Sequence, residues 1–580
     1  MGKCEISSSS LQLCLSEETH GWTLLDRRTD GRLLITDSQA LMTPVIDGQR
    51  AKVHFEPGRQ SEDGVTLNGN VEGIGKLVLE IFARAEDAID IRCSLTPEHH
   101  VQLNALELFP EGTAVVMDDV INFRNRTHTS KTWPELLLGG RGCSTTTYSN
   151  DWQFAPHPSM LMLRKMDSIL FAGCMDLPCG AFGMELAAAE HRLSHWRIQY
   201  GAHPHGLPLA AGQTFASPAI RIFLRRCSDI YQILDEFAAM LVQLGRIPDP
   251  AGKTRLPWWC EPVYCTWTDQ NFAAEVTPPA DLREQAMQGN NGPAQRILTE
   301  SFVRHAAETI LREKLPLRTI LIDDGWQVAR GQWEPESTRF PDFRGLVDDL
   351  HAMGFKVVVW WNWAEVEAAA QVDPAHLMAH GKLNHHGCRV RDYSMPRVQE
   401  EYFRPLFRKM FSSDAGCYDL DGVKTDFLAD KVHPELPPFD PSWRGEENYF
   451  RKMTELFYRE MKSHKPDAVH IGCAGHFWLA EHIDINRTYD IWLNQLEHET
   501  RAKMLKHTSP GVPVVYDLCN FMDGLDVYFD SAERMNAPVH IGNVLYLRDD
   551  PFAPPRPAGV SYYELLRKRL GRFALDAIRR

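Results

Sequence analysis

The chain has 580 residues, of which 43% are hydrophobic and 24% are charged, and its formal net charge is -15 at pH 7. This length predicts more than one domain and a substantial core, and the composition is ordinary for a globular protein. The acidic balance, with a pI near 5.9, argues against nucleic acid or an anionic membrane as a partner.

The sequence predicts a cytoplasmic protein. Its first residues, Met1 to Ile6, contain no apolar stretch of signal-peptide length, and no segment approaches the ~20 apolar residues of a membrane helix. The 13 cysteines are odd in number and scattered, which favours buried free thiols in a reducing compartment over a disulfide framework.

The first part of the chain has the pattern of antiparallel strands. Apolar residues recur at every second position, as at Leu77, Leu79 and Ile81, and turn signals such as Asp47-Gly48 follow at short intervals. Helical periodicity is scarce before residues 230–244, and residues 246–252 have the composition of a linker. We therefore expect an N-terminal β-sandwich domain over residues 1–245, followed by a second domain over residues 253–580.

In the second part, short apolar runs alternate with helical patterns. The strand candidates are residues 263–266, 319–322, 356–360, 422–425, 468–471, 512–516 and 543–547, and helical stretches include 295–315 and 343–353. This alternation predicts a (β/α)8 barrel or a doubly wound sheet. The barrel is favoured because no glycine-rich phosphate loop follows a strand, and because functional side chains follow several different strands.

The motif Asp323-Asp324-Gly325-Trp326 follows the apolar run 319–322 directly. Carboxylates accept hydrogen bonds from sugar hydroxyls, and an indole stacks on the apolar face of a pyranose ring. The same tetrapeptide is also ordinary turn chemistry, so the motif alone is a weak signal for a sugar site.

A second strand candidate, residues 422–425, also leads into an acid, Asp426. Lys424 precedes Asp426 by two positions, so in a strand both side chains point to one face, and the cation lowers the carboxylate pKa. An ionised carboxylate suits a nucleophile, although a structural ion pair is the alternative interpretation. A retaining glycosidase needs a second carboxyl group ~5 Å away, for which Glu481, Asp484 and Asp490 are candidates.

These motifs together resemble the melibiase-type α-galactosidases of glycoside hydrolase family 36, within clan D. The resemblance is carried by residues 323–326, by Gly331-Gln332-Trp333, by Arg339-Phe340-Pro341 and by Lys424-Thr425-Asp426. An arginine shortly before an aspartate, here Arg487 and Asp490, is similar to the acid/base region of that family. The family's fold, a β-supersandwich before a (β/α)8 barrel, agrees with the division of this chain.

The resemblance implies a retaining α-glycosidase, most simply an α-galactosidase acting on terminal α-galactosides. Asp426 would be the nucleophile and Asp490 the acid/base. The implied substrate-binding residues are Asp323 and Asp324 for sugar hydroxyls, Lys424 and Arg487 for orienting the ring, and Trp326, Trp267 and Trp361 as pocket walls. Core packing is the alternative for the tryptophans, since only one of Trp360 and Trp361 can face the barrel interior.

Some features depart from the family pattern. Two residues separate Arg487 from Asp490 where relatives commonly have three, so Asp484 competes for the acid role. Transglycosidase activity, another α-glycoside specificity, or a catalytically silent sugar-binding protein are therefore alternatives, and a homo-oligomer is compatible with the resemblance.

We expect neither a metal nor a cofactor. His380, His385, His386 and Cys388 are metal-ligand residue types, but they lack a fixed ligand spacing. The reaction that the resemblance implies needs only two carboxyl groups.

Overall fold

A computed structural model gives the fold of the chain. It describes residues 3–16, 21–29, 32–37, 41–56, 58–109, 114–116, 119–122, 135–138, 146–147, 160–165, 167–176, 182–189, 192–200, 206–227, 229–282, 292–378, 388–426, 438–443, 446–472, 477–488 and 495–579.

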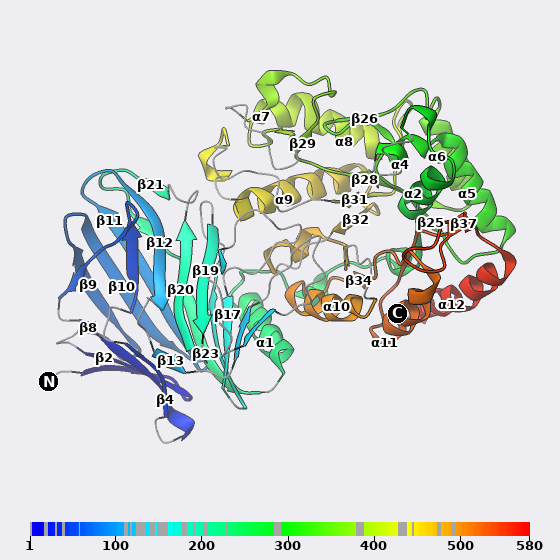
Figure 1. The fold of residues 1–580 in the computed structure, drawn as a ribbon. Helices are drawn as coiled ribbons and strands as arrows, with labels where there is room; N and C mark the ends of the chain where they lie inside the picture. The colour runs from blue at the N-terminus through cyan, green and yellow to red at the C-terminus, as the bar shows by residue number, and fades with distance from the viewer. Residues whose placement is uncertain are drawn as a thin grey trace.

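The N-terminal region consists of two antiparallel sheets (Figure 1). Among the described residues, the first sheet contains β1 (Lys3–Ser7), β2 (Leu11–Ser16), β3 (Trp22–Asp26), β4 (Arg32–Asp37), β5 (Thr43–Ile46), β6 (Gln49–Arg50), β12 (Val101–Phe109), β13 (Ala114–Val116), β16 (Thr146–Thr147), β19 (Phe182–Ala189), β20 (Arg192–Tyr200) and β21 (Leu207–Leu209).

The second sheet packs on the first. Its described strands are β7 (Val53–Phe55), β8 (Arg59–Gln60), β9 (Gly64–Val71), β10 (Gly75–Arg84), β11 (Ala88–Pro97), β14 (Asp119–Asn122), β15 (Glu135–Leu138), β17 (Met160–Lys165), β18 (Ser168–Cys174), β22 (Phe215–Ala216) and β23 (Ile220–Arg226). The period-two residues Leu77, Leu79 and Ile81 of β10 are fully buried in the core, as alternation requires.

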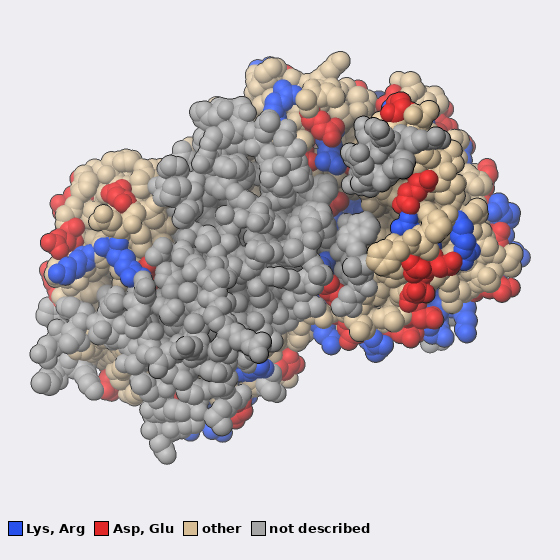
Figure 2. All heavy atoms as spheres, viewed as in Figure 1, with Lys and Arg blue, Asp and Glu red and all other residues tan. Residues whose placement is uncertain are grey.

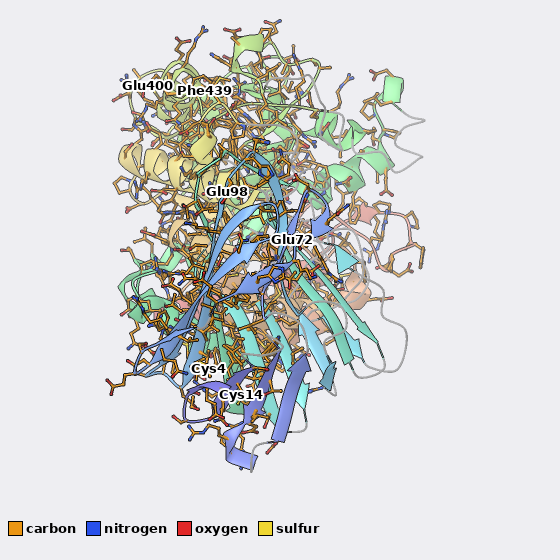
Figure 3. All side chains as sticks on the ribbon, turned by 90° about the vertical axis from the view of Figure 1, so that its left-hand side faces the viewer. Cys4, Cys14, Glu72, Glu98, Glu400 and Phe439 are labelled. Atoms are coloured by element: carbon orange, nitrogen blue, oxygen red, sulfur yellow. The ribbon has the colours of Figure 1, made fainter. Side chains whose placement is uncertain are left out.

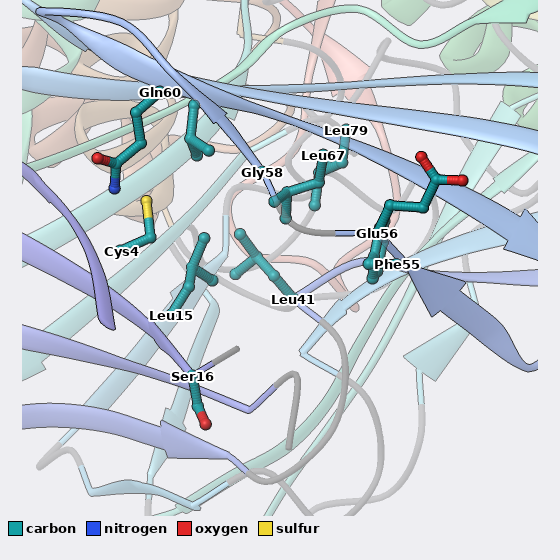
Figure 4. Close-up of a pocket in the computed structure, with 11 residues that line it drawn as sticks. Cys4, Leu15, Ser16, Leu41, Phe55, Glu56, Gly58, Gln60, Leu67 and Leu79 are labelled. Atoms are coloured by element: carbon teal, nitrogen blue, oxygen red, sulfur yellow. The ribbon is translucent and has the colours of Figure 1, made fainter. Parts of the chain in front are cut away.

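A small cavity of about 100 Å³ lies among these strands (Figure 4). Its described lining is mainly apolar and includes Cys4, Leu15, Leu41, Leu67 and Leu79. All of these residues belong to the N-terminal region, so the cavity is separate from the barrel.

The barrel consists of eight parallel strands with a continuous hydrogen-bonded order from β34 to β35. In chain order these are β24 (Val263–Cys265), β25 (Thr319–Ile322), β28 (Lys356–Trp361), β31 (Gly422–Thr425), β32 (Val469–Gly472), β33 (Ile485–Arg487), β34 (Val514–Val515) and β35 (His540–Ile541). A parallel bridge between Tyr516 and Val539 joins β34 to β35, and Tyr516 exchanges two backbone hydrogen bonds of 2.8 Å with Pro538 and His540. The barrel is thereby closed.

Helices flank these strands. They are α2 (Trp267–Val276), α4 (Gly292–Ile297), α5 (Glu300–Arg312), α6 (Phe343–Ala352), α7 (Pro396–Val398) continuing through a π-turn into α8 (Arg404–Phe411), α9 (Glu446–His464), α10 (Glu497–Thr508), α11 (Leu525–Arg534) and α12 (Val560–Arg579). Three hairpins add β26 (Gln327–Ala329) with β27 (Gln332–Pro335), β29 (Glu365–Val366) with β30 (Arg389–Val390), and β36 (Tyr546–Leu547) with β37 (Arg556–Pro557).

Helix α1 (Ile230–Gln243) connects the two regions. Its Phe237 packs against Phe171 of β18 on one side and against Phe477 of the barrel on the other, with ring centroids 4.7 and 5.4 Å apart. Its Asp235 pairs with His507 of α10 at 2.6 Å. The N-terminal sheets and the barrel therefore share one continuous core.

The fold class predicted from the sequence is confirmed: a region of antiparallel sheets precedes an eight-stranded parallel barrel. Two details differ. The helical stretch 295–315 is divided between α4 and α5, because Thr299 caps α5 by accepting the backbone N–H of Phe302. The last barrel strand is His540–Ile541, whereas part of the predicted strand 543–547 belongs to the hairpin β36–β37.

The surface and the thiols agree with the sequence. Figure 2 shows acidic and basic side chains interspersed over the described part of the barrel face in that view. The ten cysteines in the described residues form no disulfide, and Cys4 and Cys14 lie on the paired strands β1 and β2 (Figure 3). Within the described residues, no helix is both long enough and apolar enough to cross a bilayer.

Candidate active site

The barrel interior changes from apolar to charged toward the carboxyl ends of the strands. Leu321, Val358, Ile485 and Val515 belong to one interior cluster of the barrel. Because side chains alternate along a strand, the residue two positions later faces the same interior. Those residues are Asp323, Trp360, Arg487 and Asp517. The carboxyl end of a (β/α)8 barrel is where active sites lie.

Lys424 of β31 binds Asp323, which follows β25. The ammonium lies 2.7 Å from Asp323 Oδ2, both residues are 3% exposed, and the Cys265 thiol donates to the same oxygen at 3.2 Å. Burial lowers the pKa of Lys424, but the charge of Asp323 outweighs burial, and the net pKa is raised. Lys424 therefore pairs with Asp323 across the barrel. Asp323 thus binds side chains from two other strands, Lys424 of β31 and Cys265 of β24.

Asp426, immediately after β31, is held by two donors. The indole Nε1 of Trp360 donates to Oδ2 at 3.0 Å, and the guanidinium of Arg487 donates to Oδ1. Burial raises the pKa of Asp426, but Arg487, Lys424 and the Trp360 hydrogen bond outweigh it, so the net pKa is lowered. The carboxylate is therefore ionised at neutral pH, and it lies at the carboxyl end of a central strand.

Asp517, which the sequence analysis did not select, binds the other side of Arg487. Its Oδ2 accepts from Arg487 Nη1 at 2.5 Å, both residues are fully buried, and His540 Nδ1 lies 3.6 Å from its Oδ1. The signal was available, because Asp517 directly follows the predicted strand 512–516, as Asp323 and Asp426 follow theirs. Arg487 thus joins the carboxylates of Asp426 and Asp517.

Asp324 lies beside this network, and its carboxylate accepts hydrogen bonds from three protein side chains. Gln327 donates to Oδ1 at 2.6 Å, and Gln295 and Arg330 each donate to Oδ2 at 2.8 Å. Arg330 also binds Glu365 at 3.0 Å. Three fixed donors orient the Asp324 carboxylate, and of its roughly four acceptor sites one remains, on Oδ1.

The structure separates the predicted pocket tryptophans. Trp361 is fully buried among aromatic rings of the surrounding helices, with Phe407 and Phe457 at 5.2 and 5.3 Å, and so it does not face the barrel interior. Trp326 is also fully buried and stacks on Phe343 of α6. Trp360, by contrast, contacts Asp426. The indole at the site is therefore that of Trp360, since strand alternation turns Trp361 outward.

Trp267, the first residue of α2, keeps an intermediate exposure and packs against the interior cluster of the barrel. This placement, directly beyond β24, is compatible with the wall of a pocket at the carboxyl ends of the strands.

Of the three candidates for the acid/base, Glu481 lies in the 3-10 turn Phe477–His482 with its side chain 55% exposed. Asp490 lies outside the described residues. Asp484 precedes β33 and points away from the interior, since it accepts from Tyr458 and Lys462 of α9 at 2.7 and 2.9 Å. These bonds hold Asp484 against an outer helix, so it cannot face Asp426.

Three of the residues weighed as metal ligands, His380, His385 and His386, lie outside the described residues, and Cys388 is buried. Within the described part of the chain, no group of three or more His, Cys, Asp or Glu side chains has the geometry of a metal site.

Comparison with known proteins relates the barrel to families of glycoside hydrolases. The sequence model of the glycosyl hydrolases family 31 TIM-barrel domain matches residues 258–510. A search of curated proteins returned no match. The family model that matches is that of family 31, whereas the sequence motifs resemble family 36. Both families belong to clan D, so the two findings support placement of the barrel within that clan.

The solved structures similar to this chain include glycosidases of the same architecture. An α-N-acetylgalactosaminidase from Bifidobacterium bifidum has a TM-score of 0.64 at 14% identity, covering 99% of this chain and 93% of that one. An α-galactosidase from Lactobacillus brevis has a TM-score of 0.59 at 14% identity, covering 99% and 83%. A family 36 α-galactosidase from Geobacillus stearothermophilus has a TM-score of 0.60 at 12% identity, covering 100% and 86%. At these identities the likeness establishes the fold, and with the family match it makes the barrel of this chain a glycoside hydrolase domain.

Proposed function

We propose that this protein is a retaining α-glycosidase, with terminal α-galactosides as substrates and Asp426 as the nucleophile. The observation that carries the proposal is the Asp426 carboxylate, kept ionised by Arg487 and Trp360 at the carboxyl end of a glycoside hydrolase barrel strand. A carboxylate with a lowered pKa that is fixed by two donors is ready to attack an anomeric carbon.

In the proposed reaction, Asp426 forms a bond to the anomeric carbon while the glycosidic oxygen leaves with a proton from a second carboxyl group. That group, now a carboxylate, takes a proton from water, and the water oxygen displaces Asp426 from the sugar. Two inversions retain the α configuration. An acceptor sugar in place of water would give transglycosylation by the same steps.

Asp490 is the proposed acid/base. It follows Arg487 by three positions, in the segment that leads from the end of β33 to α10. The bonds between Asp484 and α9 support this choice, because they occupy the competing carboxyl group outside the barrel.

Asp323, Asp324 and Lys424 are proposed to bind the sugar hydroxyls, with Arg487 orienting the ring and Trp267 and Trp360 as aromatic surfaces. The galactoside assignment is supported by the Asp323-Asp324-Gly325-Trp326 motif and by the similar structures, which include α-galactosidases and an α-N-acetylgalactosaminidase. We further propose that residues 1–245 and 253–580 are its two domains, and that the enzyme works in the cytoplasm, where the ten described cysteines, which form no disulfide, would stay reduced.

The first experiment is hydrolysis of para-nitrophenyl glycosides by the wild type, Asp426→Ala and Asp484→Asn. The panel contains the α- and β-galactosides, the N-acetyl-α-galactosaminide and the α-glucoside. We expect release from the α-galactoside, a loss of more than ~10³-fold in Asp426→Ala, and a kcat near that of the wild type in Asp484→Asn. Release from another α-glycoside would change the proposed substrate. If a folded wild type hydrolysed none of the glycosides, the proposed function would be refuted.

Azide separates the retaining mechanism from an inverting one in the variant Asp490→Ala, which keeps Asp426. A retaining enzyme forms the galactosyl ester of Asp426 from an activated aryl α-galactoside, and azide then displaces the carboxylate to give the α-galactosyl azide. In Asp426→Ala, by contrast, azide would attack opposite the leaving group and give the β-galactosyl azide under either mechanism. Asp490→Ala should keep activity on a 2,4-dinitrophenyl glycoside, whose leaving group needs no proton, and lose activity on an alkyl galactoside.

A further inference from the structure

The end of strand β33, which carries Arg487, is attached to helix α10 by buried side chains. Thr488 follows Arg487, and its hydroxyl lies 2.6 Å from Nδ1 of His498. Arg501, one turn further along α10, donates to the Thr488 carbonyl at 3.1 Å. Thr488 and His498 are fully buried and Arg501 is 3% exposed, so α10 holds this strand end from outside the barrel.

The Thr488 hydroxyl also binds strand β34. It accepts the backbone N–H of Asp517 at 3.0 Å. A hydroxyl has one hydrogen to donate and two acceptor sites, so after it accepts this N–H it can form the bond to His498 Nδ1 with either neutral tautomer of the ring. Burial, with the charge of Arg501, lowers the pKa of His498 to about 3, so the ring is neutral.

The histidine at this position is not explained by packing. Its ring lies between Tyr516, stacked at 5.0 Å, and Tyr528, edge-on at 5.3 Å. Its Nε2 is buried and has no hydrogen-bond partner in the described part of the chain. A buried ring nitrogen without a partner costs free energy that an apolar residue would avoid. What the histidine adds is the hydrogen bond between Nδ1 and the Thr488 hydroxyl.

The two residues that meet at Thr488 belong to the site. Arg487 precedes Thr488 directly, and Asp517 is the residue whose N–H the hydroxyl accepts; Arg487 then binds both Asp517 and Asp426. The hydrogen-bonded chain from His498 through Thr488 therefore ends on the guanidinium that contacts the proposed nucleophile.

We propose that His498 is a positioning residue, which aligns the ends of β33 and β34 through the Thr488 hydroxyl and so fixes Arg487 and Asp517 relative to Asp426. This inference rests on the proposed function for its catalytic consequence. The charged groups that face Asp426 are Arg487, Lys424 and Asp517, and those that face His498 are Arg501 and Asp517. A displaced Arg487 would stabilise the Asp426 carboxylate less, which raises the pKa of Asp426.

The test compares variants that remove or keep the two hydrogen-bonding atoms. His498→Leu and Thr488→Val remove them, whereas His498→Gln offers an amide oxygen as acceptor and Thr488→Ser keeps the hydroxyl. The control is His507→Gln on the same helix, because His507 pairs with Asp235 of α1 and is not a partner of either strand end. All are measured for kcat, KM and the pH dependence of kcat/KM on an activated aryl α-galactoside.

We expect His498→Leu and Thr488→Val to lower kcat by about 10-fold, with a smaller change in KM, and to move the acidic limb of kcat/KM upward by about half a pH unit. The conservative variants should recover most of the loss, and His507→Gln should leave the limb in place. If His498→Leu loses only stability, as His507→Gln could, and its acidic limb does not move, the positioning role is wrong.

A second measurement does not depend on turnover. Deuterium uptake of peptides that cover residues 485–488 and 514–517 should rise in His498→Leu and Thr488→Val, and stay at the wild-type level in His507→Gln. A wild type without glycosidase activity would refute the proposed function. The alignment of β33 and β34 by His498 would then be tested by deuterium uptake alone. Unchanged uptake in both peptides would refute the alignment.

Discussion

Trp360 donates its indole N–H to the Asp426 carboxylate over 3.0 Å, from the strand next to the one that Asp426 follows. The bond crosses the pair β28–β31, and Asp426 returns a backbone hydrogen bond of 3.2 Å from its N–H to the Trp361 carbonyl. Asp426 is thus fixed at both its main chain and its carboxylate by one neighbouring strand.

Trp360→Phe should raise the pKa of Asp426, because it removes a hydrogen bond to the ionised form and keeps an aromatic ring. We expect kcat/KM on an aryl α-galactoside to fall about 10-fold to 100-fold, since a hydrogen bond to a charged group contributes roughly 1.5–3 kcal/mol. Trp361→Phe is the matched control, because its ring packs against Phe407 and Phe457 outside the barrel. An equal effect of both substitutions on the acidic limb would contradict the assignment.

Lys424→Met should destabilise the protein by about 3–5 kcal/mol, because it leaves the Asp323 carboxylate buried without its cation. The double variant Lys424→Met with Asp323→Asn removes both charges, and should recover part of this loss. Urea denaturation of the two single variants and the double variant gives the coupling energy. Additive losses would show that the pair contributes no net interaction.

Asp269, in the first turn of α2, should make stability fall as the pH rises. Its carboxylate accepts the backbone N–H groups of Val544, Leu545 and Tyr546 at 2.8–2.9 Å, but complete burial outweighs these bonds and raises its pKa to about 7. A raised carboxyl pKa gives stability that is fully present below pH ~4 and is lost as the pH rises through about 7.

Asp269→Asn removes that titration. We therefore expect the difference in unfolding free energy, wild type minus variant, to decline by about 4 kcal/mol between pH 4 and 8, as follows from roughly three pKa units. Urea melts at pH intervals of one unit measure it. A difference that is constant with pH would show that Asp269 has an ordinary pKa.

Asp421 should have the opposite pH dependence. It precedes β31 and binds His351 at 2.7 Å, Lys356 and Lys465 at 3.0 Å each, and the Val357 N–H at 2.9 Å. Burial raises its pKa, but the His351 hydrogen bond, the charge of Lys465 and the Val357 N–H outweigh burial and lower it well below the usual value.

A lowered carboxyl pKa gives stability that is present above pH ~4 and is lost at more acidic pH. Asp421→Asn should therefore cost roughly 2 kcal/mol at pH 7, less than a fully buried pair because its partners are partly exposed, and the cost should shrink below pH 4. Equal losses in urea melts at pH 7 and pH 3 would contradict this prediction.

The sequence was most informative where an apolar run led into an acid. Strands β25 and β31 have the predicted bounds, and Asp323 and Asp426, which directly follow them, lie in the barrel interior. Each strand is four residues long and fully buried, so its apolar run coincides with its hydrogen-bonded length. The side chain of Lys424 points to the same face of β31 as Asp426, as the alternation of side chains along a strand predicts. Its hydrogen-bond partner, however, is Asp323.

Two failures have physical causes. Both faces of β28 are apolar, since a parallel strand is covered on both sides, and the sequence therefore does not reveal which tryptophan points inward. Strand β35 is two residues long, too short for a periodic signal, so His540 was not selected, whereas Asp517 was not weighed although it directly follows the predicted strand 512–516. The last predicted strand was consequently displaced to residues 543–547, beyond His540.

The barrel closes through its last strand, β35, which pairs with β24 at Val263 and Tyr264. These partners are separated by almost the whole length of the barrel sequence. During synthesis, β24 and β34 keep open edges until residues 540 and 541 have left the ribosome, and open edges invite pairing with other chains. A nonsense mutation shortly before residue 540 would leave the other seven barrel strands in the product, yet it should yield aggregates instead of an active enzyme.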